Sequence, residues 1–204
     1  GTRGITAFIV ESSWEGFSPG KPEEKMGIHA SVTSDIILEN VRVPKENILG
    51  KIGKGFNIAM SILDAGRVTV AAQSLGAAKG ALDTAVAYSK ERVQFGRPIA
   101  NFQNTQFTIA DMATKVEAAR QLVYSAADKL DNHQKVTTEA AMAKYYASET
   151  AVEVANKSLQ IHGGYGYMKE YAIERIYRDA RILPIYEGTS EIQKLVISRN
   201  VLAD

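Results

Sequence analysis

A change in hydrophobic spacing near residue 50 constrains the fold of this 204-residue chain more than any other feature. From Gly55 onward, apolar residues recur at steps of three and four over long stretches, which is the period of an amphipathic α-helix. Before that point they come in short runs separated by glycine, proline and serine, a pattern typical of strands and loops. The chain therefore divides into a short strand-and-loop segment and a long helical segment.

The helical segment predicts four long helices and a short one. The first is expected from Gly55 onward, and the next two at about Asn104–Leu130 and Thr138–Ile161. The short one lies between Tyr171 and Asp179, and the last runs from near Ser190 to the end of the chain. Breaks rich in glycine, proline or polar residues separate them, so the connections are short. Long helices with short connections predict an antiparallel bundle. We therefore expect a mainly α protein whose antiparallel four-helix bundle occupies residues 50–204.

Residues 1–49 contain two strand-like runs, Ile5–Val10 and Ile36–Val43, on either side of a glycine- and proline-rich loop at 12–31. Proline follows the second run and ends its pairing, because proline has no N–H to donate. Two strands alone do not make a stable sheet in water. This segment therefore needs more strands than residues 1–49 supply, and the chain begins at Gly1 in what reads as the middle of a strand.

The composition argues against several functional classes. The chain has 24 Lys and Arg against 23 Asp and Glu, and a net charge of +1 argues against nucleic-acid binding through phosphate neutralisation. No run of about 18 apolar residues predicts a membrane span, and no basic-then-apolar start predicts secretion. The absence of cysteine excludes disulfides, thiolate catalysis and cysteine-ligated zinc. No metal site is expected, since His162 has no second ligand at suitable spacing.

Glu187 is the first candidate for chemistry. It follows Ile185 and Tyr186 and directly precedes a glycine and a predicted helix start. Thr189 or Ser190 is expected to cap that helix. A carboxylate among apolar side chains is expected to be partly desolvated, and a partly desolvated carboxylate suits a general base. The alternative is an ordinary solvated glutamate in a loop.

A glycine-rich segment, Gln160–Tyr167, is the second candidate. Three glycines within four positions allow positive φ angles and close approach of a planar cofactor or a phosphate to the backbone. The alternative is a helix end and turn. The segment is not a dinucleotide-binding fingerprint, because it follows a helix instead of joining a strand to the start of one.

Two other segments carry weaker signals. Arg92 and Arg97 flank Phe95 in a predicted turn, which suits an anion site, although cations are also common at helix ends. Gly66 lies inside the first helix, next to Arg67, where a glycine costs roughly 1 kcal/mol relative to alanine. That cost predicts something close to the backbone, either a ligand or another packed element.

Taken together, these segments resemble the acyl-CoA dehydrogenase family. The resemblance covers the whole chain and rests on motifs in the family's order and spacing: Lys25–Ile28 with Val41–Pro44, Leu63–Arg67, Glu91–Gly96 with Gln103, Gln160–Gly166, Arg178–Ala180 and Ile185–Gln193. It implies a flavin enzyme that oxidises an acyl-CoA thioester to the trans-2-enoyl-CoA. In that family a glutamate removes the α-proton, FAD accepts a hydride from Cβ, and an electron-transferring flavoprotein takes the electrons.

The resemblance assigns a role to each candidate residue. Glu187 corresponds to the catalytic base. Some members carry the base just before the arginine that matches Arg67, and the Gly66 found here favours Glu187. Substrate contacts are implied for Asp64, Ala65, Gly66, Arg67 and Gly188. Contacts to FAD are implied for Arg92, Gln103, Gln160, Ile161, His162, Gly163, Gly164, Thr189, Ser190 and Glu191.

The resemblance also implies the setting of the protein. Some FAD contacts in the family reach the cofactor of a neighbouring subunit, so a homo-oligomer is implied, typically a tetramer. Fatty acid β-oxidation of short or medium straight-chain substrates is expected, in the cytoplasm of a bacterium or the mitochondrial matrix of a eukaryote. The family chain is roughly twice as long, so the resemblance implies that residues 1–49 are the C-terminal part of a β-barrel-like middle domain and that this chain is the C-terminal half of a longer protein. The missing part includes strands that contact the flavin and the substrate in the family, so we expect the 204-residue chain alone to bind little FAD and to be inactive.

Other functions stay open from the sequence. The chain could be a helical assembly or binding module without turnover. It could also be a relative of the acyl-CoA oxidases, which deliver electrons to oxygen. A relative of the nitroalkane oxidases is expected to have aspartate where this chain has Glu187.

Overall fold

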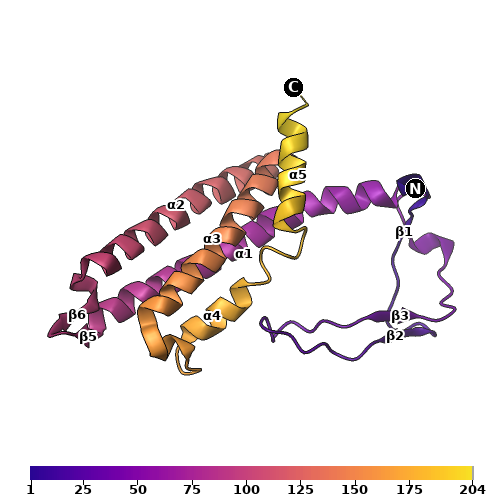
Figure 1. Cartoon of the computed structure of the whole chain (residues 1–204). Coiled ribbons are helices and arrows are strands. Elements are labelled where there is room, and N and C mark those ends of the chain that lie inside the picture. The colour runs from indigo at the N-terminus through magenta and orange to yellow at the C-terminus, as the bar shows by residue number, and fades with distance from the viewer. Residues whose placement is uncertain (204) are drawn as a thin grey trace. The chain divides into compact units, whose positions relative to one another are not determined.

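The structure is a computed structural model in which residues 1–203 are described (Figure 1). The chain forms two compact units, residues 1–63 and the residues from Asp64 on. The boundary between them lies inside α1 (Gly55–Glu91). The domain division expected after residue 49 stays a prediction. No helix in the described range is both long enough and apolar enough to cross a membrane.

Two short antiparallel strand pairs make up the sheet structure of the first unit. β1 (Ala7–Phe8) pairs with β4 (Ile48–Leu49), and β2 (Phe17–Pro19) pairs with β3 (Ile36–Leu38). Short 3-10 helices occupy Thr2–Gly4 and Lys45–Asn47. All three residues of β3 are exposed, so this pair buries little apolar surface.

The strands predicted from sequence are partly wrong. The runs Ile5–Val10 and Ile36–Val43 contain strands, but shorter ones, and the two runs do not pair with each other. β3 is followed closely by Asn40, whose φ of 53° takes the backbone out of the extended conformation. The expected loop at 12–31 contains β2. Apolar composition marks extended chain, whereas partner and register depend on the tertiary fold.

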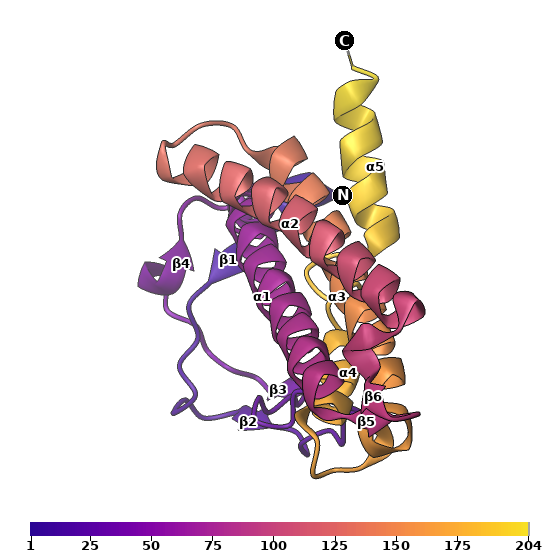
Figure 2. The same ribbon diagram turned by 90° about the vertical axis from the view of Figure 1, so that its left-hand side faces the viewer.

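The second unit is helical, and the predicted mainly α class is confirmed. Besides α1 it contains α2 (Gln103–Asp131), α3 (Thr137–His162), α4 (Ala172–Ala180) and α5 (Ser190–Val201). In Figures 1 and 2, α1, α2 and α3 lie side by side, and the chain reverses direction from each to the next. α4 and α5 both pack against α3.

The predicted breaks also contain small ordered elements. A hairpin of β5 (Val93–Gln94) and β6 (Arg97–Pro98) joins α1 to the 3-10 helix Ile99–Asn101. Its turn residues Phe95 and Gly96 both have positive φ, at 50° and 80°. Another 3-10 helix, Gly163–Tyr167, follows α3.

Small side chains build the core of the helical unit. The buried apolar residues of α1, α2 and α3 are mostly alanine and valine, which lets the helix backbones approach closely. The close approach permits a direct bond between helices: the Oγ of Ser158 on α3 donates to the carbonyl of Ala81 on α1 at 2.8 Å. This bond helps to fix the position of α3 along α1.

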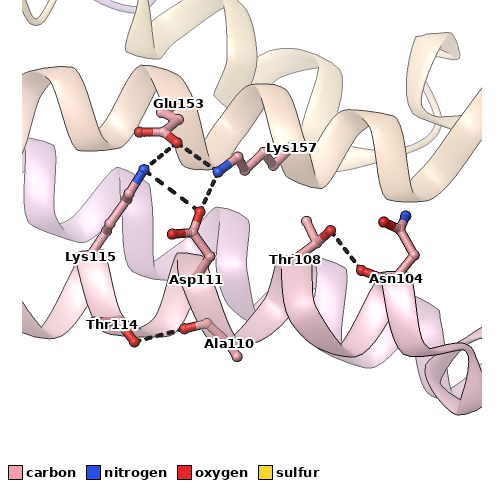
Figure 3. Close-up of polar contacts among 8 residues, drawn as sticks. All are labelled: Asn104, Thr108, Ala110, Asp111, Thr114, Lys115, Glu153 and Lys157. Carbon is pink, nitrogen blue, oxygen red and sulfur yellow. Dashed lines mark hydrogen bonds and ion pairs between the residues drawn. The ribbon is translucent and has the colours of Figure 1, made fainter.

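A cluster of four charged residues joins α2 to α3 (Figure 3). Lys157 contacts both Asp111 and Glu153, and Lys115 contacts the same two carboxylates. The bonds from Lys157 hold the pKa of Asp111 below its usual value, and those from Lys115 and Lys157 do the same for Glu153. The same contacts raise the pKa of Lys157.

Candidate functional site

The loop between α4 and α5 presents Glu187 in a strained backbone conformation. Glu187 has a φ of 54° and Gly188 a φ of 92°. A left-handed conformation costs a residue with a Cβ about 1–2 kcal/mol, so contacts elsewhere must hold this one in place. The hydroxyl of the preceding Tyr186 donates to Gln73 on α1 and ties the loop to that helix.

The carboxylate of Glu187 lies directly against the backbone of Gly66 on α1. A Cβ at Gly66 would stand 2.6 Å from Oε2 of Glu187 and 3.2 Å from its Cδ. Only glycine therefore accommodates the carboxylate in this position. The glycine inside the helix predicted that something lies close to the backbone at this point. In the structure, it is the side chain of Glu187.

The expected desolvation of Glu187 by its sequence neighbours is wrong for this chain. Glu187 is exposed, and Ile185 is 46% exposed. The apolar residues that turn into the bundle are Leu183 and Pro184 instead. The loop thus anchors itself with its first part and presents the carboxylate to the surface.

Two buried side chains that the sequence did not reveal hold the backbone at Glu187. Lys144 on α3 donates from Nζ to the carbonyl oxygen of Gly188 at 2.7 Å. Gln193 on α5 donates from Nε2 to the carbonyls of Gly188 at 2.9 Å and Glu187 at 3.1 Å. Neither Lys144 nor Gln193 has exposed surface.

The ammonium of Lys144 is far from its ordinary environment. Burial lowers its pKa from 10.5 to about 8, and the positive charge of Arg67 acts in the same direction. Lys144 lies on α3 between Ala140 and Ala147, in the stripe of small residues that faces the core. A lysine within such a stripe is the sequence signal that could have identified it.

The buried Arg67 pairs with the partly buried Asp64 on α1 beside Gly66. Nη1 of Arg67 lies 2.8 Å from Oδ1 of Asp64, and Thr137 of α3 donates to the other carboxylate oxygen at 2.7 Å. Nε of Arg67 is buried and has no hydrogen-bond partner among residues 1–203. Ala65, between them, is partly buried.

Thr189 caps α5, which resolves the choice between Thr189 and Ser190. The Thr189 Oγ1 accepts a bond from the N–H of Ile192 at 3.4 Å. Ser190 is buried, and its hydroxyl donates to Glu149 on α3 at 2.5 Å. Glu191, in the first turn, is exposed. The structure thus brings the substrate candidates and the three candidates from Thr189 to Glu191 near one end of the bundle.

The other candidates gather at the opposite end of α1. A cleft of about 480 Å³ is lined by residues that include Arg92, Ile161, His162, Gly163 and Gly164. The guanidinium of Arg92 lies 5.2 Å from the ring centroid of Tyr165. A Cβ on Gly163 or Gly164 would have no neighbour within 4 Å, so the backbone there is open.

His162 is a core residue at the base of this cleft. Its ring stacks on Tyr88 with centroids 4.2 Å apart, and Nδ1 lies 2.7 Å from the carbonyl oxygen of Ser158. Burial lowers the pKa of His162, which favours the neutral ring. Its side chain therefore supports the wall of the cleft.

Gln160 lines a second cleft at this end, whereas Gln103 is only a sequence neighbour of residues that line it. Gln160 and Ile161 line a hollow of about 520 Å³. Gln103 is exposed at the first position of α2. Its neighbour Asn104 lines the same hollow as Gln160. The structure therefore separates the predicted FAD residues into two groups. From Gly66 to the end of α1 the helix rises about 37 Å, farther than one extended FAD molecule reaches.

Comparison with known proteins places the chain in a family. The family model "Acyl-CoA dehydrogenase, C-terminal domain" matches residues 53–202. The chain is 60% identical to "Caffeyl-CoA reductase-Etf complex subunit CarC" of Acetobacterium woodii, over 99% of this chain and 53% of that protein. It is 59% identical to "3-(aryl)acrylate reductase" of Clostridium sporogenes, over 99% of this chain and 54% of that protein.

A solved structure agrees with these matches. The fold superposes on butyryl-CoA dehydrogenase from Megasphaera elsdenii with a TM-score of 0.98 and 52% identity, covering 99% of this chain and 53% of that one. The chain spans about half the length of the curated relatives it matches. Motif order, helical architecture and these matches together show that the chain belongs to the acyl-CoA dehydrogenase family.

Proposed function

We propose that the protein carrying this chain is a flavin enzyme that oxidises an acyl-CoA thioester to the trans-2-enoyl-CoA, with Glu187 as the base. The observation that carries the proposal is the carboxylate of Glu187, held against Gly66 by a strained loop. Strained residues persist where the surrounding structure over-determines them, and they cluster at functional sites.

The chemistry requires a carboxylate in a set position. The α-proton of a thioester is weakly acidic, so its base must stand beside it and be shielded from water during the transfer. Exposure of Glu187 leaves the carboxylate accessible to a substrate, which would itself supply part of the cover. We propose that the substrate path also includes Asp64, Ala65, Gly66, Arg67 and Gly188.

The residues of the two clefts suit FAD. The guanidinium of Arg92 matches a phosphate, the Tyr165 ring offers a stacking face, and the glycines leave the backbone open. FAD, when bound, supplies the acceptor for the hydride from Cβ. We propose contacts from Arg92, Gln103, Gln160, Ile161, Gly163 and Gly164, with His162 supporting the cleft wall. At the other end we propose Thr189 and Glu191, with the buried Ser190 fixing the start of α5.

The separation of the two groups favours a homo-oligomer. One FAD does not reach from Gly66 to the end of α1, so we propose that each group contacts the FAD of a different site, in two subunits of a tetramer. Light scattering of the full-length protein measures the subunit number, and a monomer with a full complement of FAD would contradict this. An electron-transferring flavoprotein is the proposed electron partner, because one relative is named as a subunit of an Etf complex.

The reverse reaction is a second candidate. The two relatives named above from the sequence comparison are both called reductases. The carboxyl group that forms when Glu187 takes up an α-proton could return that proton to the α-carbon of an enoyl-CoA, since forward and reverse reactions share a transition state. Initial rates of butyryl-CoA oxidation and crotonyl-CoA reduction, each with an artificial electron carrier, distinguish the preferred direction.

The variant Glu187→Gln tests the base in the full-length protein. It should keep the yellow flavin spectrum and lose activity on butyryl-CoA and longer thioesters by roughly 10²–10⁴-fold, the usual contribution of a general base. Glu170→Gln, at an exposed position before α4, is the matched control and should keep wild-type activity. Normal turnover in Glu187→Gln would overturn the proposed function.

A further inference from the structure

We propose that Lys144 is a positioning residue for Glu187: from α3, its ammonium holds the Gly188 carbonyl so that the loop keeps the Glu187 carboxylate against Gly66. The inference rests on the proposed role of Glu187 as the base. It adds to the site a residue that touches neither the thioester nor the reacting atoms.

Stability alone does not account for a lysine at this position. Lys144 has no exposed surface, and burying an ammonium is unfavourable unless bonds compensate for the lost hydration. The hydrogen bond given by its Nζ goes to a backbone carbonyl, not to a carboxylate. A methionine of similar volume would fill the space without that desolvation. The hydrogen bond to the Gly188 carbonyl therefore explains why an ammonium is buried here.

The charges around Lys144 come from every element packed against it. Arg67 on α1 repels its positive charge, whereas Glu149 on α3, Glu187 in the loop and Glu191 on α5 favour it. The lysine thus lies where three helices and the loop of the base meet. The three carboxylates offset part of the cost of burying the ammonium, and its hydrogen bond to Gly188 fixes the loop.

The backbone at Glu187 requires such a holder. The φ of 54° is unfavourable for a glutamate, so the loop relaxes unless its carbonyls are fixed. The Gly188 carbonyl accepts from both Lys144 and Gln193. Gln193 turns its amide nitrogen to the loop, and its buried Oε1 has no partner in the described part of the chain. Both side chains accept an energetic penalty in the position that fixes the loop.

Replacement of Lys144 in the full-length, FAD-loaded protein tests the proposal, with butyryl-CoA as the probe. Lys144→Met should lower kcat by roughly 10²-fold, because small misplacements of a reacting group have effects of this size. KM should change little, since substrate contacts remain. Lys144→Gln keeps a shorter, neutral hydrogen-bond donor, so its kcat should lie between those of the wild type and Lys144→Met. Lys129→Met, which removes an ion pair between α2 and α3, is the control and should keep wild-type kcat.

Hydrogen–deuterium exchange gives a readout that does not depend on turnover. In Lys144→Met the amides of residues 183–191 should exchange faster, while those of α2 and the rest of α3 stay as in the wild type. A wild-type kcat in Lys144→Met, or faster exchange across the whole helical unit, would overturn the positioning role. Lys144→Gln provides the same comparison if the methionine variant does not fold.

The two proposals fail in different ways. Normal activity in Glu187→Gln would show that Glu187 is not the base, and Lys144 would then have no base to position. An inactive Glu187→Gln beside a fully active Lys144→Met would leave the base in place and refute only the role of Lys144.

Discussion

Replacing Gly66 by alanine should separate activity from stability. The new Cβ would lie 2.6 Å from Oε2 of Glu187, whereas ordinary contacts of this kind begin at 3.4 Å. The carboxylate must therefore retreat by about 0.8–1 Å to reach van der Waals distance. Because Oε2 is at the end of a flexible side chain, the retreat itself requires little energy.

The two consequences have opposite signs. A displacement of about 1 Å at a reacting group lowers kcat by roughly 10²-fold, equivalent to a barrier about 2.7 kcal/mol higher. Alanine inside a helix is more favourable than glycine by about 1 kcal/mol, so the free energy of unfolding should stay level or rise slightly. We expect Gly66→Ala to be a well-folded protein with a poor base.

The assay measures kcat and KM with butyryl-CoA and the free energy of unfolding in urea. Gly76→Ala is the matched control, since Gly76 is exposed on the same helix and a Cβ there would meet nothing within 4 Å. It should raise stability by up to about 1 kcal/mol and leave kcat unchanged. A wild-type kcat in Gly66→Ala, or a loss of several kcal/mol of stability, would refute the geometry described for Glu187.

Two predictions concern stability and pH. The folded pKa of Lys144, about 8, lies below its ordinary 10.5, so between these values the unfolded chain binds more protons and the free energy of unfolding should rise with pH, by on the order of 3 kcal/mol. Urea titrations at pH 7 and 10 should show this rise in the wild type relative to Lys144→Met, and parallel curves would contradict it. Glu153 has a lowered folded pKa, so its contribution is present above pH 4.5 and is lost as pH falls through the folded value. Melting temperatures from pH 6 to 2 should fall less steeply in Glu153→Gln, and added salt should reduce the difference; equal slopes in the two proteins would show that the cluster in Figure 3 contributes nothing.

The helices and the position of the loop that carries Glu187 were predictable from the sequence alone. A helix is local, so spacing and breaks placed the ends of α2, α3 and α4 within one residue of their observed bounds. The order of the motifs was enough to indicate the family. Glu187 stood out because a glycine and a helix start follow it.

Strand pairing and the surroundings of Glu187 were decided by the tertiary structure. Pairing joins segments far apart in sequence, so the partners of β1 and β3 could not be predicted from two apolar runs. Exposure of Glu187 was missed because sequence neighbours do not determine which side of a loop faces the core. Its contact with Gly66, and the bonds from Lys144 and Gln193, exist only because three helices pack around one loop. Spacing along the chain identifies the residues that form each element, whereas packing between elements determines which of them meet.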